Sequence, residues 1–536
     1  MADDYIWWRD GIIYQIYPRS FQDSNNDGLG DLPGIISRLD YLADLGVDAI
    51  WLSPIYPSPD KDFGYDVSNY VDVDPRFGNL QDFDNLLKEA HRRNIHIILD
   101  LVLNHTSDQH PWFLQSRSSK DNPYRDWYIW HPGKGSGMRP NNWQSVFGGD
   151  GWEFDPQTGE YYFHMFVKEQ PDLNWHNPEV RKAILDVFKF WLDRGVDGFR
   201  LDVFNAYFKD AQLRDNPPHP GIRGFDRQKH VYDVDQPEML PLLAEIRALM
   251  DKYKDRYAIG ETFISTPQKA VNYTGAHRLH AAFNFTILEK PWQAEKFAQG
   301  ISIWDDLNQA DLWPNQVLNN HDQRRISTRY QFDPDDKLAK TAAALILTLR
   351  GTPFLYYGEE IGMRDIHLSR TEILDPPGRK FWPFYKGRDG CRSPMQWDDN
   401  PFSGFSNAKP WLPVHPDYMN RNVLAQRNDP GSLLNFYKLL IQIRRSTPAF
   451  QRGSFELIQG VPKHILAFIR SNENQKILIL LNFKLKPLHF TLPDGIEVEN
   501  SKVLINSLQG QDFYPFKAGD VELQPGQVLI LELAVT

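Results

Sequence analysis

Hydrophobic positions along the chain repeat one pattern, in which an amphipathic stretch is followed by a glycine and then by a short apolar run. In residues 34–56, apolar side chains recur at helical spacing up to Gly46, and the apolar run comes directly after it. Residues 180–204 repeat the same order around Gly195. A helix that ends at a glycine and leads into a fully apolar strand is the unit of a parallel α/β fold.

Further apolar runs predict more strands of this kind, at residues 12–21, 95–103, 256–262, 315–322 and 352–360. Most of these strands end in polar side chains that could take part in chemistry: Asp100, Asn104, His105, Arg200, Asp202, Glu261, His321, Asp322, Glu359 and Glu360. Only a closed barrel brings the ends of so many strands together, whereas an open sheet gathers ligand groups at one switch point. The pattern therefore predicts an α/β fold with a (β/α)8 TIM barrel.

Two regions depart from this pattern and predict separate domains. Residues 104–173 are rich in Trp, Pro, Gly and Asn, which predicts a domain inserted after the third barrel strand. From about residue 452 the chain changes to short alternating runs separated by turn residues, as in an antiparallel β-sandwich. We therefore expect a catalytic barrel at 1–103 and 174–451, an inserted domain at 104–173, and a C-terminal domain at 452–536.

Composition and charge exclude several classes of function. The chain of 536 residues is 41% hydrophobic and carries a net charge of −11, which argues against a nucleic-acid partner bound by general electrostatics. Cys391 is the single cysteine, so an intrachain disulfide is impossible. The N-terminus has no signal-peptide pattern and no apolar run approaches the length of a membrane span. We expect a cytoplasmic protein with no membrane partner.

The strand-end acids Asp202, Glu261 and Asp322 suggest acid–base chemistry on a sugar. Two carboxyl groups at close range suit a retaining glycosidase, in which one is the nucleophile and the other is first an acid and then a base. Arg200 lies on the same strand face as Asp202 and could keep it ionised. Any one of these acids could equally cap a helix, but the full set is harder to explain in that way.

Seven short strings, in order along the chain, carry a family resemblance. They are "GYD" (64–66), "DLVLNHTS" (100–107), "QPDLNW" (170–175), "GFRLDVF" (198–204), "IGETF" (259–263), "NNHD" (319–322) and "CRSPMQW" (391–397). Together they resemble the signatures of glycoside hydrolase family 13, in the oligo-1,6-glucosidase-like branch of the α-amylase superfamily. The resemblance covers almost the whole chain.

The resemblance implies roles for individual residues. Asp202 would be the nucleophile, Glu261 the acid/base, and Asp322 the residue that holds the sugar's 2- and 3-hydroxyls. Asp66 and Arg392 resemble the pair that closes the pocket and binds the terminal 4-hydroxyl, which implies exo action. The remaining substrate-binding candidates are Tyr65, His105, Phe147, Phe166, Gln170, Arg200 and His321.

The stretch "DSNNDGLGD", residues 23–31, matches the first half of a calcium-binding EF-hand loop, but Gly34 stands where the closing glutamate should be. In relatives a loop of this spacing holds a divalent ion without EF-hand helices. The resemblance therefore implies a structural Ca²⁺ site, with Mg²⁺ as the alternative. Its expected ligands are Asp23, Asn25, Asp27, the carbonyl of Leu29, and Asp31.

The expected activity is that of a retaining α-glucosidase that releases glucose from short oligosaccharides, with some transglucosylation. Val203 directly follows the expected nucleophile. In this branch a valine there accompanies α-1,6 activity, and a threonine or alanine accompanies α-1,4 activity. Valine and threonine differ mainly by a methyl in place of a hydroxyl, and one such difference cannot settle the linkage. The alternatives are a glucosyl-transferring or isomerising relative, of the sucrose isomerase or trehalose-forming type, and a non-catalytic carbohydrate-binding subunit. The expected partner is a small oligosaccharide, bound by a monomer or small homo-oligomer.

Overall fold

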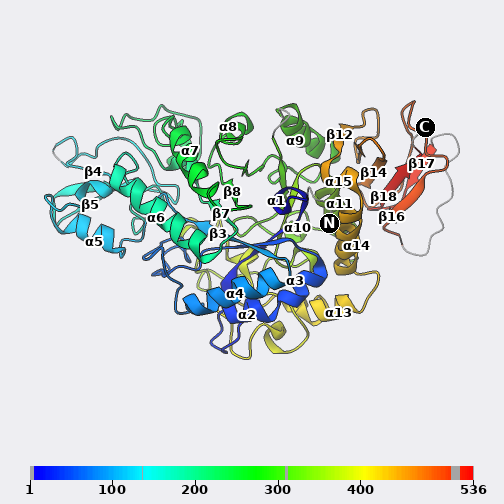
Figure 1. The fold of residues 1–536 in the computed structure, drawn as a ribbon, viewed down its shortest axis with the longest axis horizontal. Coiled ribbons are helices and arrows are strands. Elements are labelled where there is room, and N and C mark those ends of the chain that lie inside the picture. Colours follow the sequence, from blue (N-terminus) through cyan, green and yellow to red (C-terminus); the bar gives the residue numbers. More distant parts are fainter. Residues whose placement is uncertain (1–4, 136, 308–311, 509–519, 535–536) are drawn as a thin grey trace.

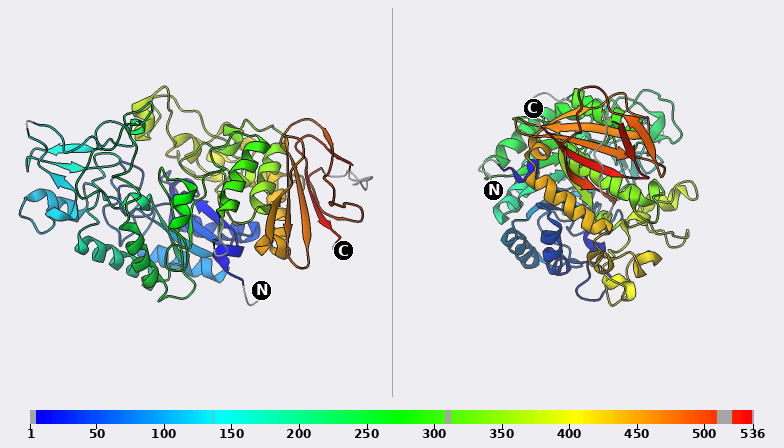
Figure 2. Two further views of the ribbon diagram at one scale, coloured as in Figure 1. Left: turned by 90° about the horizontal axis from the view of Figure 1, so that it is seen from above. Right: turned by 90° about the vertical axis from the view of Figure 1, so that its right-hand side faces the viewer.

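The computed structural model describes residues 5–135, 137–307, 312–508 and 520–534. The molecule is elongated, with a barrel in the middle (Figure 1). The segment that contains β4 (Trp130–His131), β5 (Trp152–Asp155) and β6 (Glu160–Phe163) lies at one end, and the C-terminal sheets lie at the opposite end (Figure 2). This arrangement confirms the prediction of a barrel with an insertion after its third strand and a C-terminal antiparallel unit.

In the part of the chain that the structure describes, eight parallel strands form the barrel, in the order β10-β11-β1-β2-β3-β7-β8-β9. The side chain of Asn315 joins the two ends of this sheet. Its Nδ2 donates to the carbonyl oxygen of Ala282 at 2.7 Å, and its Oδ1 accepts the backbone N–H of Asn284 at 3.0 Å. The strands are β1 (Ile13–Ile16), β2 (Ala49–Leu52), β3 (His96–Leu101), β7 (Gly198–Leu201), β8 (Tyr257–Gly260), β9 (Ala281–Ala282), β10 (Asn315–Val317) and β11 (Thr352–Tyr356).

Alternate side chains of these strands fill the barrel, and the others pack outward against the helices. Trp51, Ile98 and Phe283 belong to the apolar cluster inside the barrel. The principal helices around it are α4 (Leu80–Arg92), α6 (Pro178–Arg194), α7 (Met239–Met250), α9 (Ala294–Asp306), α11 (Lys337–Thr348) and α14 (Leu433–Ser446).

The predicted helix before Gly46 is divided in two in the structure. Helix α2 (Leu32–Ser37) ends at Arg38, and α3 (Leu39–Leu45) begins directly after it. Gly46 and Gly195 end α3 and α6 with φ values of 93° and 105°. A left-handed conformation of this kind is costly for residues with a Cβ, and it turns the chain back toward the next strand.

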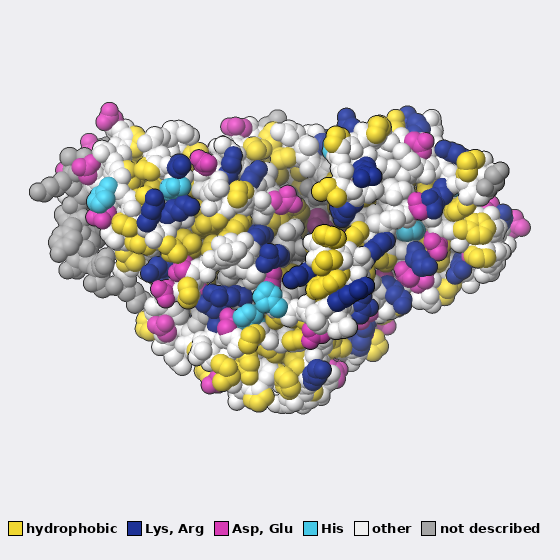
Figure 3. Space-filling view, turned by 180° about the vertical axis from the view of Figure 1, so that it is seen from behind, with side chains coloured by type: hydrophobic (Ala, Val, Ile, Leu, Met, Phe, Trp, Pro, Cys, Tyr) yellow, Lys and Arg dark blue, Asp and Glu magenta, His cyan; other side chains and the backbone are white. Residues whose placement is uncertain are grey.

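Within its described residues, the C-terminal unit consists of a five-stranded antiparallel sheet and a two-stranded one. The strands are β12 (Ser454–Leu457), β13 (Ile465–Ser471), β14 (Lys476–Asn482), β15 (Leu488–Thr491), β16 (Lys502–Asn506), β17 (Asp520–Leu523) and β18 (Val528–Leu533). The predicted domain boundaries stay predictions. Within the described ranges, no helix combines the length and the apolar character needed to cross a bilayer. On the face seen in Figure 3, acidic and basic side chains are interspersed.

Candidate active site

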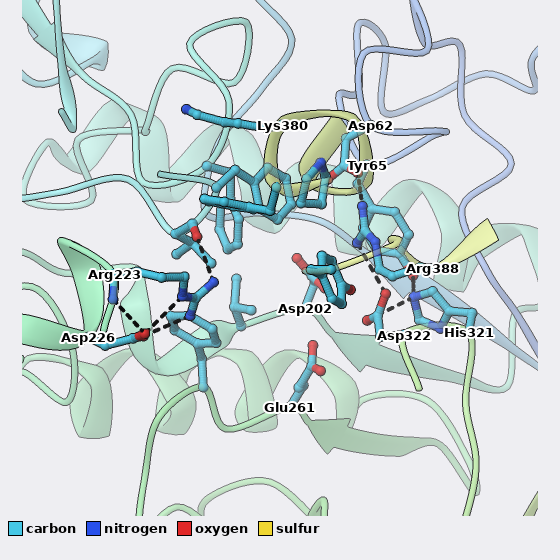
Figure 4. Close-up of a pocket in the computed structure, with 18 of the residues that line it drawn as sticks. Asp62, Tyr65, Asp202, Arg223, Asp226, Glu261, His321, Asp322, Lys380 and Arg388 are labelled. Carbon is cyan, nitrogen blue, oxygen red and sulfur yellow. Dashed lines mark hydrogen bonds and ion pairs between the residues drawn. The ribbon is translucent and has the colours of Figure 1, made fainter. Parts of the chain in front are cut away.

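The three predicted catalytic acids meet at the carboxyl ends of barrel strands. Asp202 follows β7, Glu261 follows β8, and Asp322 follows the loop after β10. All three line one cavity of about 800 Å³. Asp202 and Glu261 face the same central space in Figure 4, and Asp322 lies beside them.

Arg200 connects Asp202 and Glu261. Its Nη1 donates to Asp202 Oδ1 at 2.6 Å and to Asp100 Oδ1 at 2.7 Å, while its Nη2 donates to Glu261. Arg200 lies two residues before Asp202 on the same strand face, so the strand geometry itself points the guanidinium at the nucleophile candidate. One buried cation thus holds three carboxyl groups close to one another.

Burial and charge give the three acids different proton affinities. Burial raises the pKa of Glu261 to about 8, with Arg200 opposing the shift and Asp202 adding to it. Burial also raises the pKa of Asp202, although Arg200 favours its charged form. Burial would raise the pKa of Asp322 as well, but His321, Arg388 and Arg392 hold it well below the usual range. Glu261 is therefore the acid best suited to carry a proton at neutral pH.

Two buried histidines line the same cavity. Burial lowers the pKa of His105 to about 4 and that of His321 to about 3, so both are neutral at pH 7. The Nδ1 of His321 accepts from Gln15 Nε2 at 2.7 Å, which leaves Nε2–H facing Tyr65 Oη at 2.6 Å and Asp322 Oδ2 at 3.3 Å. Neutral imidazoles offer one donor and one acceptor, as binding to sugar hydroxyls requires.

The prediction that Asp66 and Arg392 close the pocket is wrong. Neither lines the cavity; Asp62 and Arg388 line it instead, as an ion pair at 2.6 Å. Arg388 also contacts Asp322 at 3.2 Å. Each residue of this cavity-lining pair lies four positions before the residue that the sequence pointed to.

Asp66 and Arg392 hold the groups that do face the cavity. The Asp66 carboxylate accepts the backbone N–H groups of Asp62 and Lys61, at 2.9 and 2.8 Å. Arg392 donates to Asp322 Oδ1 at 3.0 Å and to the carbonyl oxygen of His321 at 2.9 Å. Their role is to position Asp62 and Asp322.

Gln170 is likewise buried behind the cavity and does not line it. Its Nε2 donates to the carbonyl oxygen of Tyr65 at 3.1 Å and lies 3.0 Å from His105 Nε2. It therefore positions two residues that do line the cavity.

The aromatic candidates Tyr65, Phe147 and Phe166 all line the cavity. Tyr65 donates to Asp100 Oδ2 at 3.1 Å and stacks on His321 with ring centroids 5.3 Å apart. Phe147 and Phe166 pack edge to face at 5.7 Å, so they contact each other as well as the open space.

A buried lysine that the sequence did not point to joins the inserted segment to the barrel. Lys209 Nζ lies 2.9 Å from Asp172 Oδ2 and 3.0 Å from Asn104 Oδ1. Asn104 Nδ2 is in turn 3.2 Å from His105 Nδ1. No pattern in the sequence marks Lys209, because a lysine after a strand is usually exposed. Its contacts fix the orientation of His105.

The acidic side chains of the loop 23–31 bind the loop's own backbone. Asp23 accepts the N–H groups of Asn25, Asn26 and Gly28, and Asp31 accepts those of Ser24 and Gly34. Among the residues that the structure describes, no three side chains of His, Cys, Asp or Glu form a group that could hold a metal ion. The calcium site with Asp23, Asn25, Asp27, Leu29 and Asp31 stays a prediction.

Comparison with known proteins identifies the family. Residues 15–453 match the family described as "Alpha amylase, catalytic domain". The chain belongs to the α-amylase family of glycoside hydrolases. This glycoside hydrolase places its three acids where the barrel of the family presents them, at the carboxyl ends of the strands.

Relatives of this glycoside hydrolase extend over nearly its whole length. A "Probable alpha-glucosidase" of Rhizobium meliloti (strain 1021) is 45% identical over 500 residues, 90% of each chain. An "Oligo-1,6-glucosidase" of Parageobacillus thermoglucosidasius is 40% identical, over 98% of this chain and 99% of its own. The solved structure of an "alpha-glucosyl transfer enzyme", XgtA, is 41% identical with a TM-score of 0.93, over 99% of this chain and 100% of its own.

Proposed function

We propose that this glycoside hydrolase is a retaining, exo-acting α-glucosidase that releases glucose from the non-reducing end of short oligosaccharides with α-1,4 or α-1,6 links. The observation that supports the proposal is that Arg200 holds both Asp202 and Glu261. A double displacement needs two carboxyl groups about 5–5.5 Å apart, with no room for a water molecule between the nucleophile and the sugar.

In the proposed reaction Glu261 donates its proton to the glycosidic oxygen while Asp202 Oδ attacks the anomeric carbon. The leaving sugar departs, and the glucosyl group is held as an ester on Asp202. Glu261, now a carboxylate, takes a proton from water as the water attacks the same carbon, and Asp202 leaves as a carboxylate. Two inversions restore the α configuration. Asp322, which Arg388 and Arg392 keep ionised, would accept hydroxyl hydrogens from the sugar ring.

The proposal of exo action is supported by the ion pair Asp62–Arg388. Both groups line the cavity, and a dashed line joins Asp62 to Arg388 in Figure 4. Their charged atoms could bind the outermost hydroxyl of a glucosyl group. A chain that continued past this pair would have to break a partly buried ion pair, which is costly.

A second candidate function is glucosyl transfer, in which an alcohol takes the place of water. The outer part of the cavity favours this candidate, because it is lined largely by apolar side chains such as Phe381 and Phe384. The name of the similar transfer enzyme is in line with it. Val203 lines the cavity beside Asp202, which is consistent with acceptance of α-1,6 links.

Product analysis tests the proposed function. The wild type is incubated with maltose, isomaltose, sucrose and trehalose, and products are followed by chromatography and by ¹H NMR of the first glucose released. We expect α-glucose from maltose and isomaltose, with Asp202→Asn reducing its release to background. β-Glucose as the first product, or wild-type rates in Asp202→Asn, would contradict the double displacement.

A further inference from the structure

The cavity changes its chemical character between its inner and its outer part. The inner part is lined by ionisable and hydrogen-bonding groups, among them Asp202, Glu261 and Arg388. The outer part, which we call the apolar mouth, is lined by Ile222, Phe263, Phe381, Trp382, Phe384 and Tyr385. Ile222 and Phe384 are 89% and 98% exposed, and large apolar side chains that gather at a surface mark a binding site more often than not.

Charged groups at the apolar mouth already bind one another or the backbone. Arg223 and Asp226 form a bidentate ion pair, with distances of 2.7 and 2.9 Å (Figure 4). Lys380 Nζ donates to the carbonyl oxygen of Gly148. A sugar in this position would bring several hydroxyl groups against the large apolar side chains of the mouth, which offer few hydrogen-bond partners. Hydroxyl groups that lose water without gaining partners weaken binding.

The aromatic residues of the mouth belong to a loop whose two ends are joined. Arg388 donates its backbone N–H to Asp375 Oδ2 at 3.0 Å, and its guanidinium lies 2.7 Å from Asp375 Oδ1. A Cβ added at Gly378 would lie 2.8 Å from the Cα atom of Gly387, so the backbones pack directly at the neck of the loop. Residues 375–388 therefore form a compact loop closed on itself.

The same loop is connected to the inner pocket and to the inserted segment. Arg388, at its end, also binds Asp62 and Asp322. Phe381 packs against Gly148, where an added Cβ would lie 2.6 Å from its ring. The apolar mouth is thus fixed relative to the glucosyl position, as a subsite for the second half of a substrate must be.

We propose that the apolar mouth is an aglycone and acceptor subsite for an apolar alcohol of about the size of one aromatic ring. This inference rests on the proposed α-glucosidase function. The hydroxyl oxygen of the alcohol attacks the anomeric carbon of the glucosyl–Asp202 ester. The bond from that carbon to Asp202 breaks, with its electron pair returning to the carboxylate. The hydroxyl proton passes to Glu261, and the product is an α-glucoside of the alcohol.

Competition between acceptors tests the proposal. 4-Nitrophenyl α-glucoside is the glucosyl donor, and benzyl alcohol and glucose are supplied at equal concentration in large excess over it. Benzyl α-glucoside and the glucosyl-glucose disaccharides are quantified by chromatography, and total turnover is followed by the 4-nitrophenol released. We expect the wild type to glucosylate benzyl alcohol at least about tenfold faster than glucose. Transfer to glucose at an equal or higher rate overturns the inference.

Variants locate the preference in the mouth. Phe384→Ser and Ile222→Ser replace exposed side chains, so folding is not at risk, and we expect each to lower the preference for benzyl alcohol severalfold. Leu485→Ser, which replaces a half-exposed residue of the C-terminal unit, is the matched control and should retain the preference. An unchanged preference in both mouth variants overturns the inference.

The two proposals fail in different ways. If the wild type releases no glucose from maltose, isomaltose or 4-nitrophenyl α-glucoside, the proposed function is wrong and the inference falls with it. If glucose is released with α configuration but benzyl alcohol is not preferred, the inference alone is wrong. Circular dichroism and the melting temperature of every variant show that a changed product pattern is not a folding defect.

Discussion

Glu261 is the residue whose protonation should set the alkaline limit of activity. In the proposed reaction it must be protonated when the glycosidic bond breaks, and burial raises its pKa to about 8. We therefore expect kcat/KM on maltose to fall as pH rises through about 8, because the acid form is lost. In Glu261→Gln, kcat on maltose should fall by about 10² to 10⁴-fold, the typical share of general acid catalysis.

A substrate with a good leaving group provides the control for this prediction. 4-Nitrophenolate departs with little need of a proton, so Glu261→Gln should lose much less activity on 4-nitrophenyl α-glucoside in the glycosylation step. The fall of kcat/KM at alkaline pH should also disappear for Glu261→Gln with that substrate. An alkaline limb that persists unchanged in Glu261→Gln would assign the titration to another group.

Asp62 and Asp66 should respond differently to the same substitution. Asp62 faces the cavity with Arg388, so Asp62→Asn should raise KM for maltose by at least about tenfold through loss of a charge-assisted contact. Asp66 is buried and binds the backbone of residues 61 and 62. Asp66→Asn should lower the melting temperature, with a smaller change in KM.

Steady-state kinetics and thermal unfolding on both variants measure these effects. The result that would contradict the corrected assignment is the reverse order, with the large KM change in Asp66→Asn and a stable, kinetically normal Asp62→Asn. The sequence could not choose between the two, because each acid has a second one four residues away. For the same reason the sequence could not choose between Arg388 and Arg392, which are also four residues apart.

At the scale of elements, the period of apolar positions predicted most of the barrel. Seven of the strands, β1, β2, β3, β7, β8, β10 and β11, fall within apolar runs recognised in the sequence. Strand β9 (Ala281–Ala282) is two residues long and is held in part by Asn284 and Asn315, so it leaves no apolar run to recognise. The sequence did not predict the break between α2 and α3 at Arg38, because the helical spacing of apolar residues continues through it.

The rule that polar residues at strand ends converge also had limits. It grouped Asp202, Glu261 and Asp322 correctly in space, but it also included Glu359 and Glu360 at the end of β11. Those two glutamates are buried away from the cavity lining and accept hydrogen bonds from tyrosines, Glu360 from Tyr14 and Glu359 from Tyr437. Strand ends fix which edge a residue is on, but not whether its side chain turns inward or outward.

Glu359 should make the fold sensitive to alkaline pH. Burial raises its pKa to about 7, above the value of 4.5 that applies to an exposed glutamate. A carboxyl group with a raised folded-state pKa gives its full stabilisation at low pH and loses it as pH rises through about 7. Glu359→Gln cannot ionise, so its melting temperature relative to the wild type should improve between pH 5 and pH 9.

Scanning calorimetry across this pH range measures the difference. Gln retains an oxygen that can accept from Tyr437, which makes it the closest uncharged replacement. Leu485→Ser, which removes no ionisable group, is a control in which the difference should stay constant with pH. A difference between Glu359→Gln and wild type that does not change with pH would show that Glu359 keeps one protonation state throughout.

For the loop 23–31 we propose a structural Ca²⁺ ion, with Mg²⁺ as the weaker alternative. The loop carries hard oxygen donors at Asp23, Asn25, Asp27 and Asp31, the type that Ca²⁺ prefers. Millimolar Ca²⁺ should raise the melting temperature more than Mg²⁺ does, and EDTA should lower it more than it lowers the initial rate. Asp27→Asn, on the exposed side of the loop, should reduce the Ca²⁺ effect. A melting temperature insensitive to Ca²⁺, Mg²⁺ and EDTA would contradict the site.

At the scale of the whole molecule, the barrel and the C-terminal sheets share one hydrophobic core. Leu466, Phe468 and Ile479, from β13 and β14, belong to the same buried cluster as the barrel helices. Helix α11 packs between them (Figure 1). Because this apolar core is continuous between the two units, separating them would expose apolar surface to water, which is costly.

Arg470 on β13 adds a polar connection within this shared core. It is fully buried, and its guanidinium donates to the carbonyl oxygens of Thr348, Phe450, Gly453 and Ser454. The Thr348 carbonyl belongs to the last residue of α11, where a positive charge also opposes the negative end of the helix dipole. Removing the guanidinium would leave several buried carbonyl groups without their donor.

We therefore expect the barrel and the C-terminal unit to unfold together. Arg470→Leu should lower the free energy of unfolding by at least about 3 kcal/mol, since hydrogen bonds to a charged group contribute about 1.5–3 kcal/mol each. Calorimetry should show one transition in the wild type and one, at lower temperature, in the variant. Lys502→Leu, on an exposed part of β16, should change little. Two separate transitions in the wild type, with Arg470→Leu shifting one of them alone, would mean that the shared core does not couple the units and that the C-terminal sheets are an independent fold.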